Sequence, residues 1–190
     1  MLGLIDPLLE EIGKKWQNRE NVSFSSAYVA GKVAEYTLNK YMDEYKEEDS
    51  NILRRKKYTI IVGNIFDDFH SLGRSILANY LRISGWNVID LGSDVSSEMF
   101  IEEAIKNMPS VIAVSAMIYS TAMNIKDLIS KLNKLNLRKS VPVICGGAIF
   151  KFKPLLGKEI GCDASGKNAF EANRMIEELL VDYEFKTKST

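Results

Sequence analysis

The sequence predicts a doubly wound α/β fold of the Rossmann-like (flavodoxin-like) kind, with a five-stranded parallel sheet. Two observations indicate this fold. From Tyr58 onward, short runs rich in β-branched residues recur along the chain. Each run is followed by a stretch whose apolar residues have the spacing of an amphipathic helix. Strands and helices that alternate in this way form βαβ units, whose crossovers place parallel strands side by side.

Four strand segments are clear in the sequence, and a fifth is weaker. The strands are expected at YTIIVGN (58–64), WNVIDLG (86–92), VIAVSA (111–116), VPVICGG (141–147) and near Cys162 to Ala164. The helices are expected at about 73–84, 96–107, 121–135 and 168–180. Sheets of this class bind ligands beyond the carboxyl ends of their strands, where the strand order reverses. The loops that follow the strands are therefore the places to search for a site.

A helical region is expected before the α/β domain. Residues 4–17 carry apolar side chains three and four apart, and a second amphipathic helix extends to about Tyr45 with Val29 and Val33 facing inward. The charged segment 46–57 has the composition of an exposed linker. The expected organisation is a helical cap region at 1–50, a linker at 51–57, the α/β domain at 58–184 and a tail at 185–190.

Composition limits the classes of function. The chain has 190 residues, of which 46% are hydrophobic, and 25 basic residues balance 25 acidic ones. Zero net charge argues against a general binder of nucleic acid or of anionic membranes. The chain has neither an apolar run near the roughly 20 residues needed to span a bilayer nor a signal-peptide pattern in its first residues. We therefore expect a cytoplasmic protein.

The cysteine count also constrains the chemistry. Cys145 and Cys162 are too few for a disulfide framework or a zinc site. Cys145 falls in a predicted buried strand and Cys162 in a turn. Both are expected to be small apolar fillers rather than redox groups.

The first loop of the predicted sheet carries a candidate metal ligand. It contains Asp68-x-His70-x-x-Gly73, and His70 is the only histidine of the chain. Imidazole is a common metal ligand whose second nitrogen usually donates to a carboxylate, a part that Asp68 could play. One histidine cannot hold a bare ion, so a metal would have to arrive inside its own ligand cage. The alternative is a surface-loop histidine with no ligand.

Two further loops extend this pattern. Ser115-x-Met117 follows the third predicted strand, and Gly146-Gly147 ends the fourth. Together with the first loop they resemble the signature of cobalamin-binding domains, which is Asp-x-His-x-x-Gly, Ser-x-Leu and Gly-Gly. Within that class, SAMIYSTAMNIKDLISKL (115–132) and IGCDASGKNAFEA (160–172) are most similar to the corrinoid proteins of methyltransferase systems. The resemblance implies a corrinoid cofactor that contains cobalt.

The resemblance also assigns residues to the cofactor site. None is expected to be catalytic, and His70 is the expected metal ligand. The expected cofactor-binding residues are Trp16, Asp68, His70, Ser71, Gly73, Ser115, Met117, Tyr119, Thr121, Gly146 and Gly147.

The roles implied by the resemblance are specific. His70 displaces the cofactor's own base as the lower ligand of cobalt, Asp68 is its carboxylate partner, and Thr121 extends this relay. Ser115 binds the displaced base, and the two glycines leave room for the nucleotide tail. Met117 stands where leucine is usual, a swap of similar volume that should be tolerated.

The N-terminal region is similar to the helical cap of these proteins, but it is shorter. EEIGKKW (10–16) resembles a recurring cap segment. Trp16 therefore either faces the corrin or packs in the cap. In light-sensing cobalamin regulators a Glu-His pair follows this tryptophan, and both residues are missing here.

The resemblance implies a methyl carrier without catalysis of its own, which presents base-off, His-on cobalamin to partner methyltransferases. One partner would load a methyl group from a donor such as a methylamine, methanol or an aryl methyl ether, and a second would pass it to a thiol or a pterin. The main alternative is a cobalamin-dependent sensor of light or ligand that has no DNA-binding domain of its own. The others are the cobalamin subunit of a carbon-skeleton mutase and a domain that binds no corrinoid.

Overall fold

The computed structural model describes residues 55–188 and, in the N-terminal region, Val29, Val33 and Tyr36. The chain divides into two compact units, 1–46 and 47–190, and each is considered by itself. The second unit contains a sheet of five parallel strands in the order β2-β1-β3-β4-β5. The strands are β1 (Thr59–Asn64), β2 (Asn87–Asp90), β3 (Val111–Ser115), β4 (Val143–Gly146) and β5 (Ala164–Ser165). The predicted fold class is confirmed.

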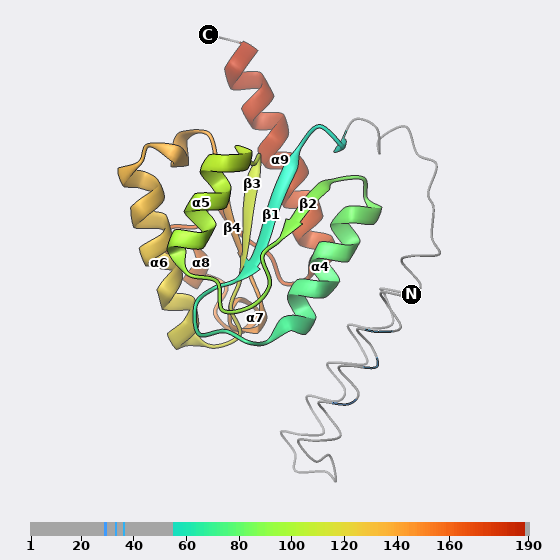
Figure 1. Ribbon diagram of the computed structural model, residues 1–190, viewed down its shortest axis with the longest axis vertical. Coiled ribbons are helices and arrows are strands. Elements are labelled where there is room, and N and C mark those ends of the chain that lie inside the picture. The colour runs from blue at the N-terminus through green and yellow to red at the C-terminus, as the bar shows by residue number, and fades with distance from the viewer. Residues whose placement is uncertain (1–28, 30–32, 34–35, 37–54, 189–190) are drawn as a thin grey trace. The chain divides into compact units, whose positions relative to one another are not determined.

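Helices cover both faces of this sheet (Figure 1). One face packs against α4 (Ser71–Ile83) and α9 (Ala169–Lys188), and its core includes Ile60, Leu81 and Ile176. The other face packs against α5 (Ser97–Asn107) and α6 (Tyr119–Lys134). Because successive strand residues point to opposite faces, Ile61 and Ile112 belong to this second core while their neighbours Ile60 and Val111 belong to the first. Strands buried on both faces explain the continuous apolar runs.

Three short helical segments were not predicted. They are η1 (Leu137–Lys139), α7 (Ala148–Phe152) and α8 (Leu156–Ile160). Helices of three to five residues are too short to show a helical periodicity in the sequence. The last helix also continues to Lys188, beyond the predicted end near residue 180.

The described residues of the first unit give a partial test of the cap. Val29, Val33 and Tyr36 are helical, as predicted. Val29 and Val33 are 57% and 58% exposed, however, so the expectation that they face inward is wrong. Two amphipathic helices cannot by themselves bury a wide apolar face. Trp16, the helix predicted at 4–17 and the other expected cap residues lie outside the described residues.

The charged segment before β1 is not simply solvated. Arg55 is partly buried: its guanidinium donates to the backbone oxygen of Ser84 at 2.9 Å and pairs with Glu177 of α9. It also lies 5.6 Å from the ring centre of Trp86. The expectation of an exposed linker is therefore wrong at Arg55, because this side chain fastens the entry to β1 onto α4 and α9.

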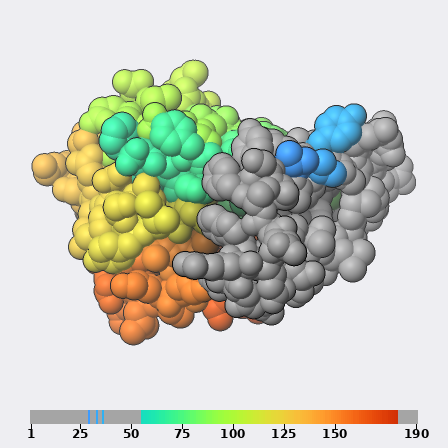
Figure 2. Space-filling model, turned by 90° about the horizontal axis from the view of Figure 1, so that it is seen from below, coloured from blue at the N-terminus to red at the C-terminus, as the bar shows by residue number. Residues whose placement is uncertain are grey.

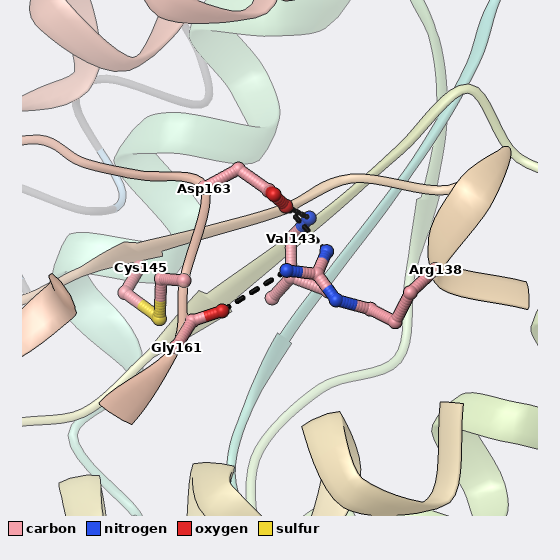
Figure 3. Close-up of a disulfide and its surroundings, with 6 residues drawn as sticks. Arg138, Val143, Cys145, Gly161 and Asp163 are labelled. Atoms are coloured by element: carbon pink, nitrogen blue, oxygen red, sulfur yellow. Dashed lines mark hydrogen bonds and ion pairs between the residues drawn. A yellow bond between two sulfur atoms is a disulfide. The ribbon is translucent and has the colours of Figure 1, made fainter. Parts of the chain in front are cut away.

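Cys145 and Cys162 form a disulfide between β4 and the turn before β5 (Figure 3). Their Cα atoms are 6.1 Å apart. Cys145 is buried as expected, but the expectation that both cysteines are unpaired apolar fillers is wrong. The α8 segment turns back at Gly161 and carries Cys162 to β4, and Arg138 holds this turn by donating to the Gly161 oxygen at 3.0 Å and pairing with Asp163.

None of the helices in the described part of the chain is long and apolar enough to cross a membrane.

Candidate functional site

The predicted site loops meet at the carboxyl ends of β1 and β3. In the sheet order these two strands are neighbours with connections that leave in opposite directions, which makes this the switch point of the fold. Asn64, the last residue of β1, lies opposite Ser115, the last residue of β3. Figure 2 shows this end of the molecule, with the β1–α4 loop in teal beside the first turn of α6 in yellow.

The centre of the site is the carboxylate of Asp68, which is completely buried. Its Oδ1 atom accepts hydrogen bonds from Asn64 Nδ2 at 3.1 Å and from the backbone nitrogen of His70 at 2.9 Å. Its Oδ2 atom accepts from the backbone nitrogen of Met117 and from Thr121 Oγ1, the latter at 3.2 Å. The backbone and amide nitrogens can only donate, so the arrangement suits a carboxylate that acts as an acceptor on both oxygens.

His70 lies at the mouth of the site, and its side chain is 59% exposed. Its Nδ1 atom lies 3.2 Å from Asp68 Oδ1. Because that oxygen is an acceptor, the hydrogen of the neutral imidazole belongs on Nδ1. The lone pair of Nε2 is then available to a metal, and the buried carboxylate fixes the orientation of the ring.

The histidine loop is held by the loop that follows β2 and by helix α6. The Asp94 carboxylate, in the loop that follows β2, accepts a hydrogen bond from the backbone nitrogen of Asp67 at 2.7 Å. The backbone N–H of Asp94 donates to the backbone oxygen of Asp68 at 3.1 Å. Asn124 of α6 donates to the oxygen of Phe66 at 3.0 Å. Asp67 and Asp94 have φ values of 66° and 58°, a left-handed conformation that aspartate tolerates better than most residues. These hydrogen bonds fix the position of the loop that carries His70.

Glycines shape the strand ends beside this loop. Gly147 has a φ of 108°, and a Cβ atom there would lie 2.1 Å from the oxygen of Ala116, so only glycine fits. Gly73, in the first turn of α4, is different: a Cβ atom there would meet nothing within 4 Å. A side chain is therefore excluded at Gly147 by the protein itself, whereas Gly73 borders open space next to His70.

One buried polar atom of the site has no partner. Asn64 is completely buried, and its Nδ2 atom donates both to Asp68 Oδ1 and, at 3.2 Å, to the oxygen of His70. Its Oδ1 atom is buried without a hydrogen bond. Buried acceptors are usually satisfied in native proteins, so an exception at a site points to a missing donor.

The remaining predicted residues surround this centre. Ser71 begins α4, and Ser115 and Gly146 are half-buried at the ends of β3 and β4. Met117 and Tyr119 are 41% and 48% exposed, and Lys153 Nζ lies 4.8 Å from the centre of the Tyr119 ring. Trp16 lies outside the described residues.

Sequence reasoning missed three residues of the site, namely Asn64, Asp94 and Asn124. Each acts through a side-chain contact that no motif marks, and two of these contacts join residues 27 and 58 positions apart. The only sequence signal was the presence of a polar asparagine at the end of an otherwise apolar buried strand.

The described residues contain no group of three or more histidine, cysteine, aspartate or glutamate side chains that could hold a metal ion. The site thus offers a metal one imidazole, with one carboxylate behind it. Ligands of doubly wound sheets bind at the switch point of the strand order. Fold and site together define a cofactor-binding α/β domain of the flavodoxin-like class.

Comparison with known proteins defines the family. Residues 58–174 match the model of the B12 binding domain, and the chain belongs to this family. The resemblance to cobalamin-binding domains expected from the three loop motifs is confirmed, and cobalamin, a cobalt corrinoid, is the cofactor of the family.

The chain is similar to several corrinoid proteins. It is 36% identical to a trimethylamine corrinoid protein of Methanosarcina acetivorans over an alignment of 117 residues, and this alignment covers 60% of this chain and 52% of that protein. It is 29% identical over 167 residues to a trimethylamine corrinoid protein of Methanosarcina barkeri, covering 86% and 73% of the two chains. The solved structure of the Methanosarcina barkeri monomethylamine corrinoid protein superposes with a TM-score of 0.73 at 27% identity, covering 90% of this chain and 78% of that one. The chain thus spans about half the length of the Methanosarcina acetivorans relative.

Proposed function

We propose that this protein is a methyl carrier, which binds cobalamin in the base-off, His-on form and presents it to partner methyltransferases. The names of its relatives, corrinoid proteins for trimethylamine and monomethylamine, support this role. The observation that carries the proposal is the arrangement of His70, whose Nδ1 faces the buried Asp68 and whose other nitrogen is left for a metal. The proposal includes a location in the cytoplasm.

The residues of the site fit a corrinoid. A corrinoid brings four ring nitrogens to its cobalt, so a single protein imidazole completes the lower side. Gly73 borders open space beside the histidine, and Asn64 has a buried acceptor without a donor. A large flat ring with a polar tail would use both features.

When bound, the corrinoid supplies a cobalt atom that accepts and gives up a methyl group. The protein's part is to hold the imidazole in one orientation and to set its proton. Asp68 Oδ1 keeps the hydrogen of His70 on Nδ1, so Nε2 faces the open side of the site. If the imidazole gains a second proton at Nε2, it can no longer bind a metal.

Thr121 extends this control away from the histidine. Its hydroxyl lies 3.2 Å from Asp68 Oδ2 and 3.0 Å from the oxygen of Ile118, and it has a single hydrogen to share between these two acceptors. Rotation of the hydroxyl would add or remove one hydrogen bond to the carboxylate. The hydrogen bonding of Asp68, and through it the hold of this carboxylate on His70, would change with the state of Thr121.

A visible spectrum of His70→Ala tests the ligation. Purified protein is mixed with hydroxocobalamin, desalted and compared with wild type, and Glu102→Ala on the exposed side of α5 serves as the control. We expect wild type and the control to retain cobalamin with a shifted spectrum. His70→Ala should lose most of the cofactor or show the spectrum of water-ligated cobalt, because the chain has no other histidine that could replace it. An identical base-off spectrum in His70→Ala would refute His70 as the ligand.

The carrier role is tested by methyl transfer. The protein is loaded with methylcobalamin and mixed with a methyltransferase that transfers the methyl group of corrinoid proteins to a thiol. The methylated thiol is then measured. We expect product only when both proteins are present, and less with His70→Ala. Product formed equally well from free methylcobalamin would contradict the carrier role.

A further inference from the structure

Three residues form a row across the carboxyl ends of the strands. The register pairs Asn64 of β1 with Ser115 of β3, and Ser115 with Gly146 of β4. Residues paired in a parallel sheet point to the same face. Counting along β1 from Ile60 and Val62, this is the face covered by α4 and α9.

The free acceptor of Asn64 belongs to this row. The orientation of its amide is fixed by its neighbours: reversing it would place Oδ1 against Asp68 Oδ1 and the His70 oxygen, which are both acceptors. The amide nitrogen therefore serves the histidine loop. Oδ1 remains completely buried and unpaired at the position next to Ser115.

Resting on the function proposed above, we propose that Asn64 Oδ1 accepts a hydrogen bond from a ribose hydroxyl of the corrinoid's buried nucleotide tail. Asn64 is then a specificity residue with two separate tasks. Its Nδ2 positions Asp68 and the backbone of His70, and its Oδ1 would recognise the tail.

The chemistry of the neighbouring side chains is complementary. The free ring nitrogen of a displaced base is an acceptor, so it matches the hydroxyl hydrogen of Ser115 and not Asn64 Oδ1. An asparagine oxygen can only accept, so it requires a donor, and the ribose hydroxyls are the donors that the nucleotide brings. An acceptor and a donor side by side at Asn64 and Ser115 distinguish a corrinoid with a nucleotide tail from one without it.

The experiment compares cobalamin with cobinamide, which has the same ring and cobalt but lacks the nucleotide. Dissociation constants of both are measured by visible titration for wild type and for Asn64→Leu, which has a similar volume and no polar atom. Loss of the Nδ2 contacts weakens the binding of both corrinoids through His70. This loss of affinity therefore cancels in the ratio of the two dissociation constants. Loss of Oδ1 affects cobalamin alone.

Thr121→Val is the matched control, because it removes a different donor from Asp68 and leaves the row of Asn64, Ser115 and Gly146 intact. We expect Asn64→Leu to reduce the preference for cobalamin over cobinamide by about three- to tenfold, the usual effect of one buried hydrogen bond. Thr121→Val should keep the wild-type preference. Asn64→Ala, which also lacks a polar side-chain atom and is smaller, gives the same comparison if the leucine variant does not fold.

The outcomes separate the two proposals. An unchanged preference in the Asn64 variants would overturn the role of Oδ1 and leave the methyl-carrier function intact. Failure of wild type to bind either corrinoid would overturn the function itself. Cobalamin with alkylated ribose hydroxyls tests the donor directly: wild type should lose its preference for this ligand over cobinamide, and a retained preference would contradict a ribose hydroxyl as the donor.

Discussion

At the scale of single residues, the site combines a rigid support with adjoining open space. Asp68 accepts hydrogen bonds from four different residues and orients His70. Its neighbours Gly73 and Gly147 are both glycines of the expected cofactor signature, but the structure gives them different reasons to be glycine. One borders open space and the other has no room for a side chain.

This difference predicts opposite results for two alanine substitutions. Gly73→Ala lies in a helix and meets no atom within 4 Å, so its stability should equal or exceed that of wild type by about 0.5–1 kcal/mol. Its retention of cobalamin after desalting should nevertheless fall, because the added methyl group enters the space beside His70. Denaturant unfolding and the cobalt spectrum measure the two effects.

Gly147→Ala provides the contrast. A positive φ and a contact of 2.1 Å with a backbone oxygen should lower the unfolding free energy by about 2 kcal/mol or more, with or without cofactor.

Full cobalamin retention by a stable Gly73→Ala protein would show that the open space is not part of the cofactor site.

At the scale of elements, the motifs on strand ends were predictable and the contacts between loops were not. Strands β1 to β4 lie within their predicted segments because continuous apolar runs mark a strand buried on both faces. Asp68, His70 and Thr121 could be placed together because each belongs to a loop motif of a recognisable fold. Asn64, Asp94 and Asn124 could not, since their roles depend on how the β1–α4 loop folds against the end of β1, the loop after β2 and helix α6.

Helices α5 and α6 are joined at the surface by Lys131. A hydrogen bond from Lys131 lowers the pKa of Glu98 below 4.5 and that of Asp127 below 3.8, and the same carboxylates, Asp127 first, raise the pKa of Lys131 above 10.5. For the carboxylates, the stabilisation is present above their unfolded pKa values and is lost as the pH falls through the lowered ones. For Lys131, it is present below 10.5 and is lost as the pH rises through the raised value.

Lys131→Met should therefore flatten the pH dependence of the melting temperature at its acid end. The effect should be small and should shrink at high salt, because Glu98 and Asp127 are exposed to solvent and Lys131 is only partly buried. Melting curves of the two proteins between about pH 2 and pH 6 at low and high salt measure it. Parallel curves at low salt would contradict this assignment.

At the scale of the whole molecule, the edge of the sheet formed by β4 and β5 is held by covalent and ionic contacts. β5 has only two residues, and the disulfide, with Arg138 and Asp163 beside it, fastens the turn before it to β4 (Figure 3). The pairing was not predictable from two cysteines 17 residues apart. It depends on the parallel alignment of two strands and on the short helix α8 between them, which the sequence pattern did not reveal.

The disulfide closes a loop of 17 residues and should contribute about 3 kcal/mol to the unfolding free energy. Reduction of the wild-type protein, or the substitution Cys162→Ala, should remove this contribution. A reductant should then cause no further change in the unfolding free energy of Cys162→Ala. Thiol titration of the unfolded protein and denaturant unfolding measure both points, and two free thiols in protein kept under air would contradict the pairing.

The central claim is that His70 is the lower ligand of cobalt, and its nitrogen can be observed directly. His70 is the only histidine, so growth on ¹⁵N-histidine labels one residue of the chain. The protein is loaded with cobalamin, reduced to cobalt(II) and examined by electron paramagnetic resonance, in which the lower ligand's nitrogen splits the cobalt lines. The account predicts triplets with unlabelled protein and doublets with labelled protein. Triplets in both samples would show that the cofactor's own base is still the ligand, and would contradict the account.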